Sequence, residues 1–160
     1  MPSYYIQKDG QLCSVEYRQN KMWLYSTMPK KGYVPFIDDN GRECQGLYCK
    51  TVEPDEVDDL FSRTIHVGFQ NAEFALFNED LTPKNAARKR TTLYTNSSET
   101  AAQFGFEKSE TGVFVKNISF KEIEYLRVNI NSIKHHHETE YRVEKNEMKR
   151  WIQENVQNVE

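Results

Sequence analysis

Residues 46–61 read GLYCKTVEPDEVDDLF, and residues 112–127 read GVFVKNISFKEIEYLR. The two stretches share four identical residues at equal spacing, because Gly46, Lys50, Glu56 and Leu60 recur as Gly112, Lys116, Glu122 and Leu126. Five further positions carry conservative replacements: Leu47, Tyr48, Val52, Val57 and Asp58 become Val113, Phe114, Ile118, Ile123 and Glu124. A stretch that recurs in this way indicates an internal duplication, which constrains the fold before any single element is assigned.

The similarity extends upstream of both stretches in two shorter blocks. Residues 9–17, DGQLCSVEY, resemble residues 71–79, NAEFALFNE, and residues 23–27, WLYST, resemble residues 92–96, TLYTN. All three pairs of blocks keep the same order along the chain. We therefore predict a tandem repeat, with a first divergent copy at 3–62, a second at 63–128, and a C-terminal extension at 129–160.

Each copy is predicted to be rich in β-strands. Tyr4–Gln7 and Gln11–Tyr17 carry aromatic and β-branched residues, and Asp9-Gly10 between them supplies the positive φ angles of a tight hairpin turn. Met22–Ser26 continues the meander, and Gly46–Val52 alternates as a further strand. Four strands and a short helix are therefore expected in each copy.

The short helix is predicted to follow the last strand of each copy. In the first copy it spans Pro54–Phe61, because Val57 and Leu60 share one face and Pro54 suits the first helical turn. In the second copy Ser119 and Glu122 have the spacing of a capping box. This second helix is expected to continue to about residue 134. Residues 127–133 also alternate as a strand would, but the helix is favoured.

A C-terminal amphipathic helix is predicted near residues 146–157. Met148, Trp151, Ile152 and Val156 line one face of it, and charged residues occupy the other. This helix is expected to dock on the body of the protein, with a groove in a partner protein as the alternative. The predicted fold class is α+β, in which two tandem β-rich repeats pack together and the terminal helix is added.

Composition excludes several classes of protein. The 160 residues are 38% hydrophobic and 12% aromatic, which is typical of a folded chain. The net charge of -3 provides no overall attraction to nucleic acid or to anionic lipid. No signal peptide or membrane-spanning run is recognised, so a cytosolic location without a membrane partner is expected. Cys13, Cys44 and Cys49 lack CxxC spacing, and we expect buried free thiols.

No catalytic residue, metal ligand or cofactor is predicted. The chain has no GxSxG motif and no glycine-rich phosphate loop. His135, His136 and His137 are consecutive, so their imidazoles point to different sides of one element and cannot converge on one ion. Solvated histidines are therefore expected. An enzyme with a cleft between the two repeats stays a minor alternative.

An acidic, aromatic surface is the main candidate binding site. The predicted partner-binding residues are Tyr33, Phe36, Asp38, Asp39, Glu53, Asp55, Glu56, Asp58 and Asp59. In the second copy Lys121 and Tyr125 replace Asp55 and Asp59, so the copies have diverged in charge. Such a surface suits a non-enzymatic, cytosolic protein-binding module. The most concrete form is an immunity or antitoxin protein that binds and neutralises a partner such as a toxin. The oligomeric state is left open.

A basic loop at residues 82–90 supports the alternative function. Its cationic residues are Lys84, Arg88, Lys89 and Arg90, and the matching segment of the first copy is only a short turn. Longer loops often carry a specific contact. A nucleic-acid-binding or regulatory module is therefore the second hypothesis, although nucleic acid is disfavoured by the charge balance and by the lack of interleaved aromatic residues.

Overall fold

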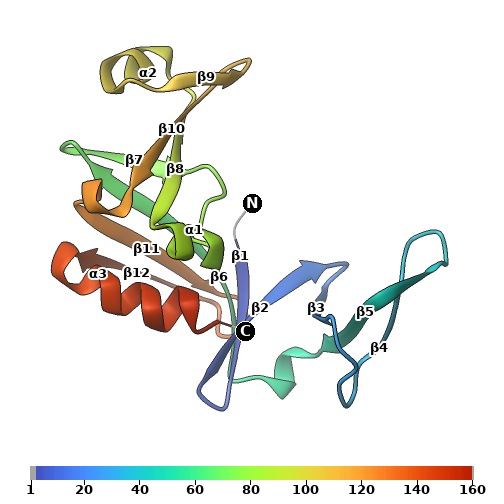
Figure 1. Ribbon diagram of the computed structural model, residues 1–160. Coiled ribbons are helices and arrows are strands. Elements are labelled where there is room, and N and C mark those ends of the chain that lie inside the picture. Colours follow the sequence, from blue (N-terminus) through green and yellow to red (C-terminus); the bar gives the residue numbers. More distant parts are fainter. Residues whose placement is uncertain (1–2, 160) are drawn as a thin grey trace.

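The computed structural model describes residues 3–159 as a mostly antiparallel, sheet-rich α+β fold, which confirms that part of the prediction (Figure 1). Within these residues the strands are β1 (Ser3–Lys8), β2 (Gln11–Arg18), β3 (Lys21–Ser26), β4 (Val34–Ile37), β5 (Glu43–Val52), β6 (Asp59–Phe69), β7 (Ala72–Leu76), β8 (Arg90–Thr95), β9 (Glu107–Glu110), β10 (Val113–Ser119), β11 (Tyr125–Ser132) and β12 (His137–Glu144). The helices are α1 (Pro83–Arg88), α2 (Ser98–Phe104) and α3 (Lys145–Ile152), with short helical turns η1 (Pro54–Glu56), η2 (Phe120–Glu122) and η3 (Gln153–Gln157).

The long strand β6 organises the sheet. The strand order is β4-β5-β3-β2-β1-β6-β7-β8-β10-β9, and β11 and β12 are added on the other edge of β6. Residues 59–63 of β6 pair with β1, whereas residues 66–69 of the same strand pair with β7. The two halves of the chain thus share β6. The repeat limits expected at residues 62 and 128 fall inside β6 and β11.

Two peripheral groups of strands have the same register. We call β3, β4 and β5 the first arm, and β8, β9 and β10 the second arm. In the first arm Met22 lies opposite Val52, and in the second arm Thr91 lies opposite Ile118. The same match holds for the four following positions of β3 and β8, for example Tyr25–Cys49 with Tyr94–Val115, and Ser26–Tyr48 with Thr95–Phe114. The blocks that resemble each other in the sequence align these same residues. The first arm projects away from the part of the protein that carries α3 (Figure 1).

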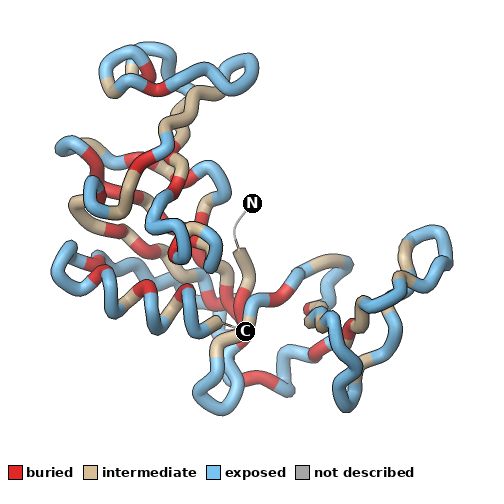
Figure 2. Tube along the Cα trace, viewed as in Figure 1, coloured by how far each residue is buried: buried red, intermediate tan, exposed pale blue. Residues whose placement is uncertain are grey.

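The buried residues form two cores on opposite sides of the sheet. Ile65 and Val67 of β6 belong to the larger core, whereas Leu60, at the other parity of the same strand, belongs to the smaller one. The smaller core lies beside the first arm and includes Met22 and Val52. The larger core lies beside the second arm, and most of the first arm is exposed (Figure 2).

The predicted C-terminal amphipathic helix is confirmed. It begins at Lys145 and continues through η3 to Gln157. Met148, Ile152 and Val156 are buried in the larger core, and Trp151 is half-buried against it. The hairpin turn at Asp9-Gly10 is also confirmed, since both residues have positive φ, 51° and 78°.

The two predicted internal helices are wrong beyond their first turn. The segment Pro54–Phe61 forms only η1, and the chain then enters β6 because the Asp58 amide donates to the Gln7 carbonyl at 2.8 Å. The helix expected up to residue 134 likewise stops at η2, although its Ser119–Glu122 capping box is present. The Glu124 amide donates to the Gly68 carbonyl at 2.8 Å, which directs the chain into β11. Sheet pairing has overridden a local helical pattern.

Candidate protein-binding surface

One side of the first arm carries a group of apolar side chains that we call the arm face: Trp23, Tyr25, Val34, Phe36 and Cys49. Tyr25 and Val34 both lie opposite Cys49 in neighbouring strands, so their side chains project to the same side. The Phe36 ring meets the Tyr25 ring edge-on, with centroids 5.7 Å apart. Val34 is 59% exposed and Tyr25 is 37% exposed. The arm face is therefore an apolar surface open to solvent.

The matched side of the second arm is more polar than the arm face. Val34 pairs with Cys49 where Glu107 pairs with Val115, so Glu107 occupies the position of Val34. Every residue of β9 is exposed. At three of the five matched positions a polar residue replaces an apolar one: Thr92 for Trp23, Glu107 for Val34 and, by position along the strand, Ser109 for Phe36. Tyr94 and Val115 occupy the positions of Tyr25 and Cys49. The edge-strand position held by Val34 in the first arm is thus charged in the second arm, where it is Glu107.

Polar side chains from β2 orient the inner end of the arm face. The Arg18 guanidinium lies 4.8 Å from the Trp23 ring and donates to the Tyr25 hydroxyl at 3.3 Å. Glu16 forms an ion pair with Arg18 at 3.4 Å. Burial and a hydrogen bond to Glu16 raise the pKa of Tyr25 to about 12, so its hydroxyl is neutral at physiological pH. These contacts hold both aromatic rings in place.

Part of the predicted acidic surface lies at the free end of the first arm. Tyr33 and Phe36 are half-buried and Asp39 is exposed. The Asp38 carboxylate caps the turn between β4 and β5, because it accepts from the amides of Asn40 and Arg42 at 2.9 Å each. Asp38 therefore has a structural task, whereas Asp39 is available to a partner.

The other predicted acidic residues lie at the opposite end of β5, a strand roughly 30 Å long. Glu53, Asp55 and Glu56 are exposed around η1. Asp58 accepts from the Asp9 amide at 3.0 Å, and Asp59 accepts from the Ser132 hydroxyl at 2.7 Å. Asp38 and Asp39 are thus separated from the other predicted carboxylates by the length of β5, whereas Tyr33, directly before β4, and Phe36, within β4, lie between the two acidic groups.

The basic segment at 82–90 is a helix and not a loop. Thr82 and Asn85 form a capping box at the start of α1, and Ala86 is buried in the larger core. Lys84, Arg88, Lys89 and Arg90 are exposed, and Arg90 donates to the Asn117 side chain at 2.7 Å. The prediction of a loop failed because a Thr-Pro start is also a helix start, and Ala86 adds an apolar contact.

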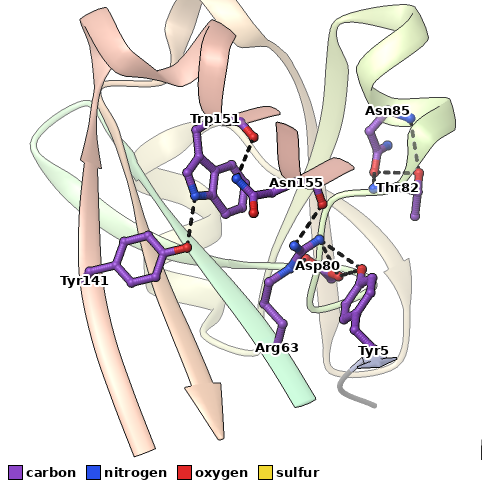
Figure 3. A network of polar contacts seen from close by, with 8 residues as sticks. All are labelled: Tyr5, Arg63, Asp80, Thr82, Asn85, Tyr141, Trp151 and Asn155. Atoms are coloured by element: carbon purple, nitrogen blue, oxygen red, sulfur yellow. Dashed lines mark hydrogen bonds and ion pairs between the residues drawn. The ribbon is translucent and has the colours of Figure 1, made fainter. Parts of the chain in front are cut away.

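A buried polar network was not predicted from the sequence (Figure 3). Arg63 and Asp80 are 2% and 1% exposed, and the Arg63 Nε donates to the Asp80 carboxylate at 2.9 Å. Arg63 also donates to the Tyr5 hydroxyl at 2.9 Å and to the Asn155 carbonyl at 3.0 Å, while Tyr5 donates to Asp80. Burial and the Asp80 charge raise the pKa of Tyr5. The network joins β1, β6, the segment before α1, and η3.

This network is closed off from solvent by aromatic rings. The Arg63 guanidinium lies 4.4 Å from the Tyr5 ring and 5.3 Å from the Trp151 ring. The Trp151 indole donates to the Tyr141 hydroxyl at 2.9 Å. Because the charged groups are paired and shielded, we assign the network to the stability of the fold. No short sequence motif signals it, since Arg63 and Asp80 are far apart in the sequence.

A second unpredicted feature is a small pocket on the side of β6 opposite the larger core. It has a volume of about 180 Å³ and is lined by Thr64, His66, Glu79 and Tyr94 among others. The His66 Nδ1 is buried, and no hydrogen-bond partner for it is found among the described residues. Burial, and then the charge of Arg127, lowers the pKa of His66. Arg127 is itself held between Glu73 and Glu140.

The low pKa of His66 makes stability depend on pH. The unfolded chain takes up this proton near the ordinary value of 6.5, whereas the folded protein resists it, so lowering the pH through that region favours unfolding. We expect His66→Gln to lose less stability than the native protein between pH 7.5 and 5.5 in urea unfolding. His136→Gln, at an exposed turn, serves as the control. An equal pH dependence in both variants would contradict the assignment.

His135 contacts the Asp58 carbonyl at 3.0 Å, and between residues 3 and 159 no three His, Cys, Asp or Glu side chains are grouped to hold a metal ion. Across the same residues no helix combines the length and apolarity needed to cross a membrane.

Comparison with known proteins adds no family. The chain matches no protein-family model, and no similar protein is found among curated proteins or solved structures.

Proposed function

We propose that the protein is a non-enzymatic protein-binding module and that the arm face is its contact surface. The observation that carries the proposal is the difference between the arms at matched sheet positions. Val34, exposed in the first arm, corresponds to the charged Glu107 in the second. An exposed apolar strand at a sheet edge is a liability unless a partner covers it.

We infer that the two arms are divergent copies of one duplicated unit. The inference is supported by their common register and by two matched contacts. Gly32 and Gly105 both have positive φ, and each lies beside a lysine side chain, Lys50 and Lys116 respectively. A duplicated unit whose core positions are kept while one surface becomes apolar fits selection for binding. The second unit also carries α1 and α2, which contribute Ala86 and Ala101 to the larger core. This supports a structural role for the second unit and a binding role for the first.

The partner class that fits is a protein with an apolar patch and a margin of mixed charge. Asp39 and Glu43 are exposed at the free end of the first arm, next to the exposed Ile37. The exposed Lys30, Lys31 and Arg42 lie on the same arm, so charged residues of both signs border the apolar centre and can orient a complementary partner. An immunity or antitoxin protein in the cytosol that neutralises a toxin is the most concrete form of this proposal.

The test is affinity purification of the tagged protein from its own host, with and without Val34→Glu. We expect the native protein to retain one stoichiometric protein partner, and the variant to retain at least tenfold less, because a buried unpaired carboxylate opposes docking. Lys108→Gln on the exposed second arm is the matched control and should retain the partner. Equal thermal unfolding of all three proteins will show that they fold.

Two results would contradict the proposal. One is a Val34→Glu variant that retains the partner as well as the native protein does. The other is an eluate that contains nucleic acid in place of protein, and that loses it when Arg88 and Lys89 are reversed in charge, which would favour the basic helix instead.

A further inference from the structure

A second pocket lies at the junction between the C-terminal segment and the sheet. Its volume is about 280 Å³, and Leu12, Phe61 and Ile130 contribute its apolar lining. Phe61 is buried, and the other two residues are half-buried. Ligand pockets that enclose a whole small molecule measure roughly 300–1,000 Å³, so this one has room for a single side chain or a molecule of that size.

The polar lining of this pocket is net negative. Asp59 and Glu154 both line the pocket. Among the described residues, Arg63 is the one positively charged residue in the lining. The Arg63 charge is offset by Asp80, and its guanidinium is occupied by Asp80, Tyr5 and Asn155. Glu154 pairs with Arg150 at 3.0 Å, but the Arg150 side chain is 85% exposed, so this pair is weak. The carboxylates therefore remain attractive to a cation.

An apolar wall beside two carboxylates matches one class of ligand. Lysine and arginine side chains consist of an apolar stem and a cationic head, and they bury the stem while the head reaches a polar partner. Charge-assisted hydrogen bonds to carboxylates are among the stronger ones in proteins. Leu12, Phe61 and Ile130 suit the stem, and Asp59 and Glu154 suit the head.

The pocket opens on the side of the strands that continues into the arm face. Tyr5 lies opposite both Phe61 and Ser14, and Glu16, two residues after Ser14, lies opposite Trp23. Strand alternation therefore puts the pocket and the arm face on one side of the sheet. We propose that this pocket receives a lysine or arginine side chain of the partner protein that covers the arm face. This inference rests on the proposed function.

The pocket can be tested without the partner, by NMR titration of the full-length protein with butylammonium chloride at constant ionic strength. We expect saturable shifts of the Leu12, Phe61 and Ile130 amides, at least tenfold weaker binding of 1-butanol, and none of butyrate. Asp59→Asn keeps an acceptor for Ser132 and should weaken butylammonium binding at least fivefold. Glu147→Gln, an exposed change on α3 outside the lining, is the matched control and should bind as the native protein does.

The partner experiment then separates the two proposals. With Asp59→Asn and Glu154→Gln combined, we expect at least tenfold less partner to be retained than by Glu147→Gln. The pocket proposal would be overturned if butylammonium did not saturate the native protein, or if it bound Asp59→Asn as tightly as the native protein. Neither result would affect the outcome of the Val34→Glu experiment. Butylammonium binding combined with full partner retention by the double variant would mean that the pocket binds a free amine, which also contradicts the inference. Failure of Val34→Glu to matter would overturn the arm face and, with it, the identity of the pocket's occupant, whereas saturable butylammonium binding would still show the pocket itself.

Discussion

Asp80→Ala is expected to lower the free energy of unfolding by about 3–5 kcal/mol, the usual cost of breaking a buried ion pair by removing one partner. The change leaves the Arg63 guanidinium, 2% exposed, without its carboxylate, and it deprives the Tyr5 hydroxyl of its acceptor. Domains are stable by roughly 5–15 kcal/mol, so a large part of the stability is at stake. Urea unfolding followed by circular dichroism measures the loss.

Two further variants show whether burial is the cause. Glu154→Gln breaks the exposed pair with Arg150 and should change stability by no more than about 0.5 kcal/mol. Arg63→Met combined with Asp80→Leu removes both charges and should recover more than half of the loss, because no uncompensated charge stays buried. A loss below about 1 kcal/mol for Asp80→Ala would mean that water reaches Arg63.

Local patterns in the sequence predicted the elements whose contacts are local. The Asp9-Gly10 hairpin and the helix carrying Met148 and Ile152 form as expected, since turn residues and a helical apolar stripe act over a few residues. The helix expected over Pro54–Phe61 fails because its outcome depends on Gln7, about fifty residues away, which accepts from Asp58. A single sequence does not show such non-local pairing.

The candidate surface was predicted in part for the same reason. Phe36 was selected because aromatic and acidic residues are neighbours in the sequence, and it does lie on the arm face. Val34 was missed, because its exposure follows from β4 being the last strand of the sheet. Its match with Glu107 appears only when the registers of both arms are known. Arg63 and Asp80 were missed because their contact is tertiary.

Ile118→Ala is expected to destabilise the whole protein by about 2–5 kcal/mol, the range for removing a buried isoleucine side chain beyond its β-carbon. Ile118 is fully buried in the larger core, which residues from β6 onward, including α3, build. Val52 occupies the matched position of the first arm, in the smaller core. The two residues therefore provide a matched pair that probes the two cores separately.

Because Val52 and Ile118 lie in cores on opposite sides of the sheet, we expect their alanine variants to affect amide exchange in different strands. The first arm joins the rest of the sheet through a β2–β3 pairing of only three residue pairs, so it can open while the larger core stays folded. Val52→Ala should therefore reduce amide-exchange protection in β3 and β5 and leave β8 and β10 unchanged. Ile118→Ala should lower protection mainly in β8 and β10, because the amides of the first arm already exchange through the smaller opening. Equal losses in both arms for Val52→Ala would mean that the two cores unfold as one unit, and that the sheet transmits stability across its two sides.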